Sequence, residues 1–234
     1  MSHIKNGKRT KLPKAKASDM IFLAVLSYLS ILVYNVLEYL IVWTPLIDVV
    51  PLGNKIWTLV LRVLCCIIWG LVFYLIVKVS RNYGFDPLEK PFEAGRLIWI
   101  SIVGTVSFIA LFAIIDKGFS TPVNTIVSGG LGYLVLLAFQ TVLRCLVISL
   151  AQKWGELAFP KAGGYIAFGG AALGILMALT HLITANDISE DIWGVLSTAL
   201  LLAAIHIYFG FVYVYTGKKL VYTAPMVYLM LLMM

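Results

Sequence analysis

Five ionisable side chains lie inside long apolar runs of the sequence and are the first candidates for chemistry: Glu38, Arg62, Arg144, His181 and His206. Such a group within hydrocarbon is costly, so each is kept either for pairing or for function. Gln140 joins them because it precedes Arg144 by four residues and shares its helix face. We expect that face to line the protein interior or a wet cavity. The alternative is that Arg144 snorkels to the headgroups.

The remaining candidates have plain structural interpretations as well. Glu38 lies late in one apolar run and Arg62 early in the next, so antiparallel spans would place them at similar depth as a structural ion pair; proton or substrate handling is the alternative. His181 follows a glycine-rich stretch that favours close helix contact and an interhelical hydrogen bond. His206 has the same two interpretations, and no ligand four residues onward completes a metal pair. We therefore expect no metal site and no cofactor.

The elements that must position these residues are helices in a membrane. The chain has 234 residues, of which 61% are hydrophobic and 12% charged, with a mean hydropathy of +0.96. Soluble domains average about 25% charged residues, so a water-soluble fold is excluded. We predict an all-α, polytopic integral membrane bundle with about seven spans, six full and a short C-terminal one. The transmembrane domain covers 19–234, with spans near 19–46, 56–79, 97–116, 124–151, 164–185, 190–216 and 220–234.

Basic residues mark one side of this bundle. Residues 1–18 form a tail with six Lys and Arg residues and no acid, and eight more lie in the predicted loops near 78–96, 152–163 and 217–219. The loops on the other side hold only Lys55 and Lys117. By the positive-inside rule the tail is cytoplasmic, and we expect it to be disordered. Because the charge of +7 lies at helix ends and in a tail, it does not predict nucleic-acid binding.

From about residue 130 to 234, the order of motifs resembles the CPBP family of intramembrane proteins, named for CAAX proteases and bacteriocin-processing enzymes. The family's Glu-Glu-x-x-x-Arg motif is similar to the run from Phe139 to Arg144, which keeps the arginine but has Phe139 and Gln140 in place of the glutamates. The Phe-x-x-x-His motif falls on the run that ends at His181 and keeps only the histidine.

The C-terminal stretch resembles the family's closing segment, through Phe209-Gly210, Thr216-Gly217 and Ala224-Pro225-Met226. The family's closing histidine falls on Leu229, and the polar residue four positions later falls on Met233. Family members hydrolyse peptide bonds with water that a glutamate activates, and this is the chemistry that the resemblance implies. Gln140 cannot act as a general base and Leu229 cannot donate to an oxyanion. We therefore predict a divergent member that lacks the catalytic glutamates and has no catalytic residues.

The leading hypothesis is a non-catalytic CPBP-like protein of a cell membrane, which we expect to be bacterial. A cavity lined by Gln140, Arg144 and His181, with His206 as a further candidate, would bind a hydrophobic peptide, a lipid or a membrane-protein partner. Family analogy implies bacteriocin immunity or an accessory role in peptide maturation. One alternative is an active intramembrane endopeptidase that uses Glu156 or Glu38, and another is a transporter or transporter subunit. The topology places His181 roughly 9 Å nearer the outer surface than Gln140.

Overall fold

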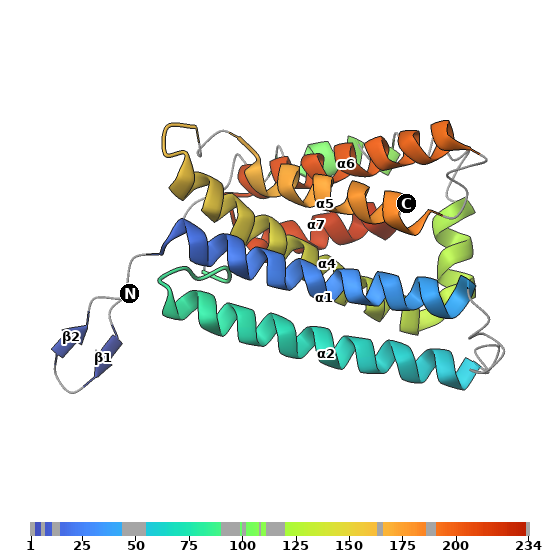
Figure 1. The fold of residues 1–234 in the computed structure, drawn as a ribbon, viewed down its shortest axis with the longest axis horizontal. Coiled ribbons are helices and arrows are strands. Elements are labelled where there is room, and N and C mark those ends of the chain that lie inside the picture. The colour runs from blue at the N-terminus through green and yellow to red at the C-terminus, as the bar shows by residue number, and fades with distance from the viewer. Residues whose placement is uncertain are drawn as a thin grey trace.

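The structure is a computed structural model that describes residues 3–5, 8–10, 15–43, 55–89, 99, 102–107, 109–110, 120–162, 166–185 and 191–232. Side chains are described for the same residues except 3–5, 8–10, 37–43, 55–59, 61 and 120–131. The protein is an all-α bundle whose main helices run side by side, with an N-terminal hairpin projecting from one end (Figure 1).

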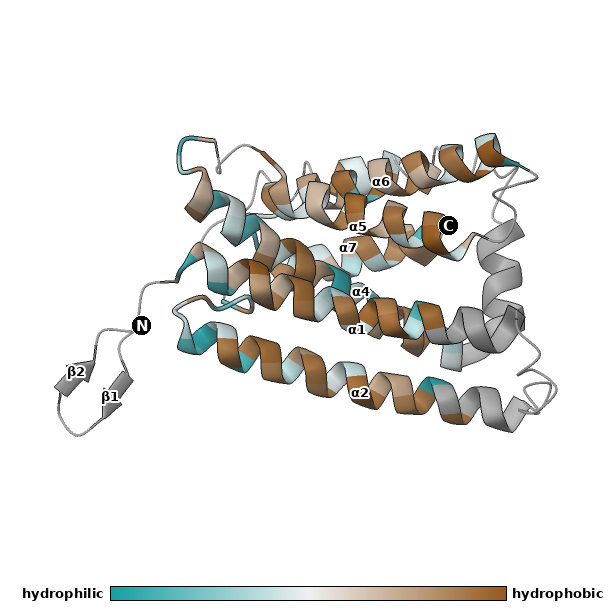
Figure 2. Ribbon diagram, viewed as in Figure 1, coloured by the Kyte–Doolittle hydropathy of each residue, from teal (hydrophilic) through white to brown (hydrophobic). Residues whose placement is uncertain are grey.

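The helix bounds follow the apolar runs of the sequence. The helices with defined bounds are α1 (Ala17–Trp43), α2 (Lys55–Asn82), α4 (Ser120–Ala158), α5 (Phe168–Thr184), α6 (Ile192–Tyr215) and α7 (Leu220–Leu232). Hydrophobic residues predominate along them (Figure 2). Within the described residues, four helices are long and apolar enough to cross a membrane: α1, α2, α4 and α6. The prediction of a polytopic helical membrane fold is therefore confirmed.

Two helices are shorter than a standard span. α7 has 13 residues, about 20 Å of helix, which agrees with the short last segment that the sequence predicts. α5 has 17 residues and begins at Phe168, later than the predicted start at 164. The predicted third span at 97–116 contains helical residues at 102–107 and 109–110, but its bounds lie outside the described residues.

α4 is the central helix of the bundle. Eight consecutive residues, 145–152, are each no more than 1% exposed. A helix buried on every face must be surrounded by other helices, and α4 packs against α1, α2, α5 and α7. A polar group in this stretch of α4 therefore faces protein on most sides.

Glycines let α5 approach its neighbours at backbone distance. A Cβ added to Gly170 would lie 2.6 Å from the Cα atom of Gly210 and 2.8 Å from the His206 carbonyl oxygen, and one added to Gly174 would lie 2.7 Å from the Ala203 carbonyl oxygen. Gly169 makes a similarly close approach to the backbone of α4. The predicted close helix contact at this glycine-rich stretch is confirmed.

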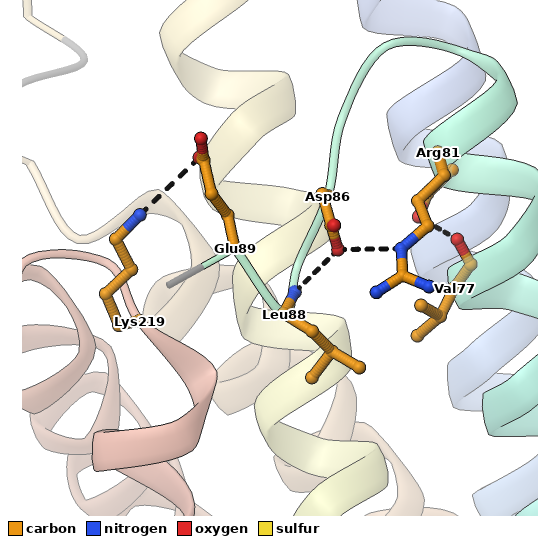
Figure 3. Close-up of polar contacts among 7 residues, drawn as sticks. Val77, Arg81, Asp86, Leu88, Glu89 and Lys219 are labelled. Atoms are coloured by element: carbon orange, nitrogen blue, oxygen red, sulfur yellow. Dashed lines mark hydrogen bonds and ion pairs between the residues drawn. The ribbon is translucent and has the colours of Figure 1, made fainter. Parts of the chain in front are cut away.

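The basic loops gather at one end of the bundle, which we call the inner end. Among the described residues, four ion pairs form there: Arg81–Asp86 at 3.0 Å, Lys219–Glu89 at 3.5 Å, Lys218–Glu156 at 2.6 Å and Lys153–Glu156 at 3.8 Å. Figure 3 shows the first two, which tie the loop after α2 both to α2 and to the start of α7. The described parts of these loops therefore lie on one side of the bundle, as the sequence predicts. Their cytoplasmic location stays a prediction.

Two short strands form a hairpin in the basic tail. Strands β1 (His3–Lys5) and β2 (Lys8–Thr10) pair antiparallel, with Lys5 opposite Lys8. Like charges directly opposite each other weaken a strand pair, and a lone two-stranded hairpin is marginally stable in water. The expectation of a disordered tail stays a prediction.

Candidate intramembrane binding site

Arg144 lies on α4, immediately before the fully buried stretch 145–152. Its Nε atom is buried and has no hydrogen-bond partner among the described residues. The residue as a whole is only partly buried, so the rest of the guanidinium group keeps accessible surface. An arginine cannot lose its proton in a protein, and Arg144 therefore presents a permanent donor and a positive charge inside the bundle.

His206, on α6, is 1% exposed. Its Nδ1 atom lies 2.7 Å from the carbonyl oxygen of Leu202, one turn earlier, and a carbonyl can only accept a hydrogen bond. Nδ1 therefore carries the proton, which leaves the Nε2 lone pair as an acceptor. Nε2 is buried without a hydrogen-bond partner in the described part of the chain. Phe209 packs against the ring edge-on at 5.2 Å between centroids and helps to hold its orientation.

Helix packing places Arg144 and His206 at the same depth. Gly169 of α5 lies against Ile148 of α4, and Gly174 of α5 lies against Ala203 of α6. The helices of each pair are antiparallel. Arg144 is four residues before Ile148, so it is level with the residue four after Gly169, which is residue 173 of α5. His206 is three residues after Ala203, so it is level with the residue three before Gly174, which is residue 171. At about 1.5 Å per residue, their depths differ by only roughly 3 Å. The positive charge of Arg144 also acts directly on the His206 ring.

Tyrosine and cysteine side chains complete the surroundings of Arg144. Its charge acts on Tyr28 of α1 and on Tyr133 and Cys145 of α4, but on no described carboxylate. The Tyr28 hydroxyl bonds across to α5, donating to the Leu176 carbonyl oxygen at 2.7 Å and contacting the Thr180 hydroxyl. The described groups on which the charge of Arg144 acts, from α1 and α4, are thus polar but uncharged.

Gln140 and His181 lie further from the inner end than this pair. Gln140 is partly buried, one turn from Arg144 and on the same face of α4. The same counting places it level with residue 177 of α5, so His181 lies about 6 Å beyond Gln140 and about 12 Å beyond Arg144. The His181 Nε2 atom is buried without a partner among the described residues. Of the predicted cavity residues, the structure therefore brings Arg144 and His206 closest in depth, and the shared cavity stays a prediction.

Glu38 and Arg62 occupy comparable depths on α1 and α2. The Trp69 indole donates to the Ser30 carbonyl oxygen at 3.2 Å, which sets the two helices in register. Glu38 is eight residues beyond Ser30 and Arg62 is seven residues before Trp69, so their backbones are nearly level. The side chain of Glu38 lies outside the described residues, and the ion pair stays a prediction. Arg62 also lines an apolar cavity of about 500 Å³ between α2 and α4, together with Gly70 and Phe139.

Glu156, the carboxylate considered for a displaced peptidase mechanism, lies far from this pair. It is twelve residues beyond Arg144 on the same helix, about 18 Å along the axis. At the inner end its carboxylate is shared by the ammonium groups of Lys218 and Lys153. Among the described residues, no group of three His, Cys, Asp or Glu side chains could hold a metal ion.

Gln152 is a buried polar residue that was not among the candidates selected from the sequence. Its amide nitrogen donates to the Ile166 carbonyl oxygen at 2.9 Å, and its amide oxygen accepts from the Gly169 backbone nitrogen at 3.1 Å. It thereby satisfies one of the free N–H groups at the start of α5 from a side chain of α4. Gln152 is the first residue of the predicted loop 152–163, and an uncharged polar residue directly after a long apolar run is the signal that could have identified it.

Comparison with known proteins finds no matching family model, no similar curated protein and no similar solved structure. The geometry of the molecule itself is thus the basis for a function.

Proposed function

We propose that the protein is a non-catalytic, CPBP-like membrane protein that binds a hydrophobic peptide, a lipid or a membrane partner at Arg144 and His206. The observation that carries this proposal is the pair of buried, unpartnered atoms, Arg144 Nε and His206 Nε2, at one depth on two packed helices. Buried polar groups are almost always bonded, so two exceptions at similar depth point to a group that is bound from outside the chain. A role in bacteriocin immunity or peptide maturation follows from the resemblance alone.

Binding without hydrolysis is favoured because Arg144 offers a hydrogen-bond donor and His206 an acceptor, whereas no described carboxylate lies beside them. Peptide hydrolysis of the family type needs a carboxylate as general base. Gln140, at the position of the family's glutamate, has none, and Glu156 is about 18 Å from Arg144 and engaged in ion pairs. We assign Gln140 to the rim of the site, one helical turn further out, where an amide can still bond a ligand.

The test uses the full chain in nanodiscs and a hydrophobic peptide with a photoreactive group. We expect the peptide to cross-link without being cleaved, and Arg144→Ala to weaken binding by about ten-fold or more, because a charge-assisted hydrogen bond is lost. Lys161→Ala is the control, since Lys161 is an exposed cation of the inner end. Equal effects of the two substitutions would reject the site.

The same preparation separates the alternatives. Mass spectrometry of the peptide would reveal cleavage, and cleavage that stops in Glu156→Gln or Glu38→Gln would establish the endopeptidase instead. Solute movement into liposomes that contain the protein, absent from protein-free liposomes, would establish the transporter.

A further inference from the structure

The chemical character of the unpartnered pair limits what it can bind. Arg144 contributes a permanent positive charge, and no described carboxylate acts on it. A lone cation inside an apolar bundle is costly, and an anionic group placed against it removes most of that cost. Guanidinium groups match carboxylates and phosphates especially well, because two parallel N–H groups meet two oxygens.

His206 adds a second requirement. With its proton on Nδ1, its Nε2 lone pair accepts a hydrogen bond and repels an oxygen that carries no proton. A carboxylic acid meets both requirements when its proton moves to Nε2, because it then leaves a carboxylate against the positive charge of Arg144 and between two donors. The carboxylate accepts from Arg144 Nε and from the protonated Nε2, and the ligand itself supplies the proton.

The surroundings indicate the rest of the ligand. The described side chains packed around this depth of α4 are apolar or uncharged, and they include Leu143 and Leu146, which are 1% and 0% exposed. A ligand that reaches Arg144 from the bilayer must therefore be an apolar chain apart from its polar end. Resting on the proposed function, we infer that Arg144 and His206 bind the terminal carboxyl group of an apolar chain. The two sources of that chemistry are the C-terminus of a hydrophobic peptide and a free fatty acid.

The experiment compares each probe with a partner that lacks the acid. The full chain is placed in phosphatidylcholine nanodiscs, whose lipid has no carboxyl group. One arm measures cross-linking of a long-chain fatty acid with a photoreactive tail against that of its methyl ester. The other compares one hydrophobic peptide with a free C-terminus and with a C-terminal amide. We expect the fatty acid to bind about ten- to a hundred-fold more tightly than its methyl ester, or the free peptide to bind more tightly than its amide by the same factor. The expected factor is that of one charge-assisted hydrogen bond.

Three variants connect this preference with the two residues. Arg144→Gln removes the charge, and His206→Phe keeps a ring of similar size while it removes Nε2; each should bring the acid down to the level of its ester or amide. Lys161→Gln should leave the preference unchanged. Arg144→Lys keeps the charge without Nε–H and should retain part of the preference, which gives a readout if one of the first two variants does not fold.

The outcomes distinguish this inference from the proposed function. Equal binding of acid and ester, and of free and amidated peptide, would mean that a bridging water fills the site and would overturn the inference. If the peptide still bound in an Arg144-dependent manner, the proposed function would stand. If neither peptide nor fatty acid bound at all, both would fail. A preference confined to the fatty acid or to the peptide identifies the source of the carboxyl group.

Discussion

Within the described part of the chain, charged side chains are paired at the inner end of the bundle, but buried polar atoms are left unpartnered at its centre, around Arg144 and His206. At the inner end, Lys218 and Glu156 approach to 2.6 Å although both side chains are partly exposed. At the centre, Arg144 and His206 keep buried atoms without partners among the described residues. Free-energy considerations alone would favour the reverse, since exposed pairs contribute little and buried unpaired groups cost much.

This difference indicates that the two regions serve different purposes. The ion pairs of the inner end hold loops in place: Glu89 and Asp86 tie the segment after α2 to Lys219 and Arg81 (Figure 3). The centre is held instead by backbone contact at glycines, which leaves its polar side chains free for another role. Three substitutions test this contrast.

The largest effect is expected where backbones meet. Gly170→Ala places a Cβ within 2.8 Å of backbone atoms of α6, so the helices must separate. We expect the free energy of unfolding, measured by titration with a denaturing detergent, to fall by about 2–3 kcal/mol, as for overpacked cores. Gly70→Ala is the matched control, because its Cβ would meet only one atom of the Phe139 ring, at 3.3 Å, and the ring can turn away. A similar loss in both variants would show that the α5–α6 contact is not special.

The next substitution separates a binding arginine from a structural one. Arg144→Met replaces an unpaired cation by an apolar chain of similar length. We expect the free energy of unfolding without ligand to rise by about 1–4 kcal/mol, as when buried ions are replaced by hydrophobic residues, while carboxyl binding is lost. The stability is measured in the same detergent titration. A loss of stability would mean that Arg144 has a structural partner, and the contrast between centre and inner end would disappear.

Much of the fold could be predicted from the sequence because hydrophobic length is a local property. The predicted first span, 19–46, corresponds to α1 at Ala17–Trp43, and the predicted sixth, 190–216, to α6 at Ile192–Tyr215. The grouping of basic loops at one end followed from charge counts along the chain. Glycines at 169, 170 and 174 indicated close packing before any neighbour was known.

The candidate site could be predicted only in part, because it depends on how far one helix slides along another. Arg144 and His206 were both identifiable as buried polar residues. Their common depth is set by the contacts of Gly169 with α4 and of Gly174 with α6, which leave no local signal in the sequence. The late start of α5 at Phe168 is equally non-local, since Gln152 of α4 bonds the backbone nitrogen of Gly169.

The smallest effect is expected at the inner end. Glu156→Gln removes the charge that Lys218 and Lys153 share, but these side chains are 34% and 32% exposed and Glu156 is 22% exposed. Solvent therefore screens the attraction, and we expect a loss of no more than about 1 kcal/mol in the free energy of unfolding. The loss should shrink further at high salt, because the ion atmosphere screens exposed charges. Glu89→Gln should cost less still, because Glu89 is 63% exposed and its oxygen lies 3.5 Å from Lys219.

Thermal unfolding of both variants at low and high salt provides the measurement. A loss in Glu156→Gln that is large and independent of salt would show that the inner end, rather than the glycine contacts, holds the bundle together.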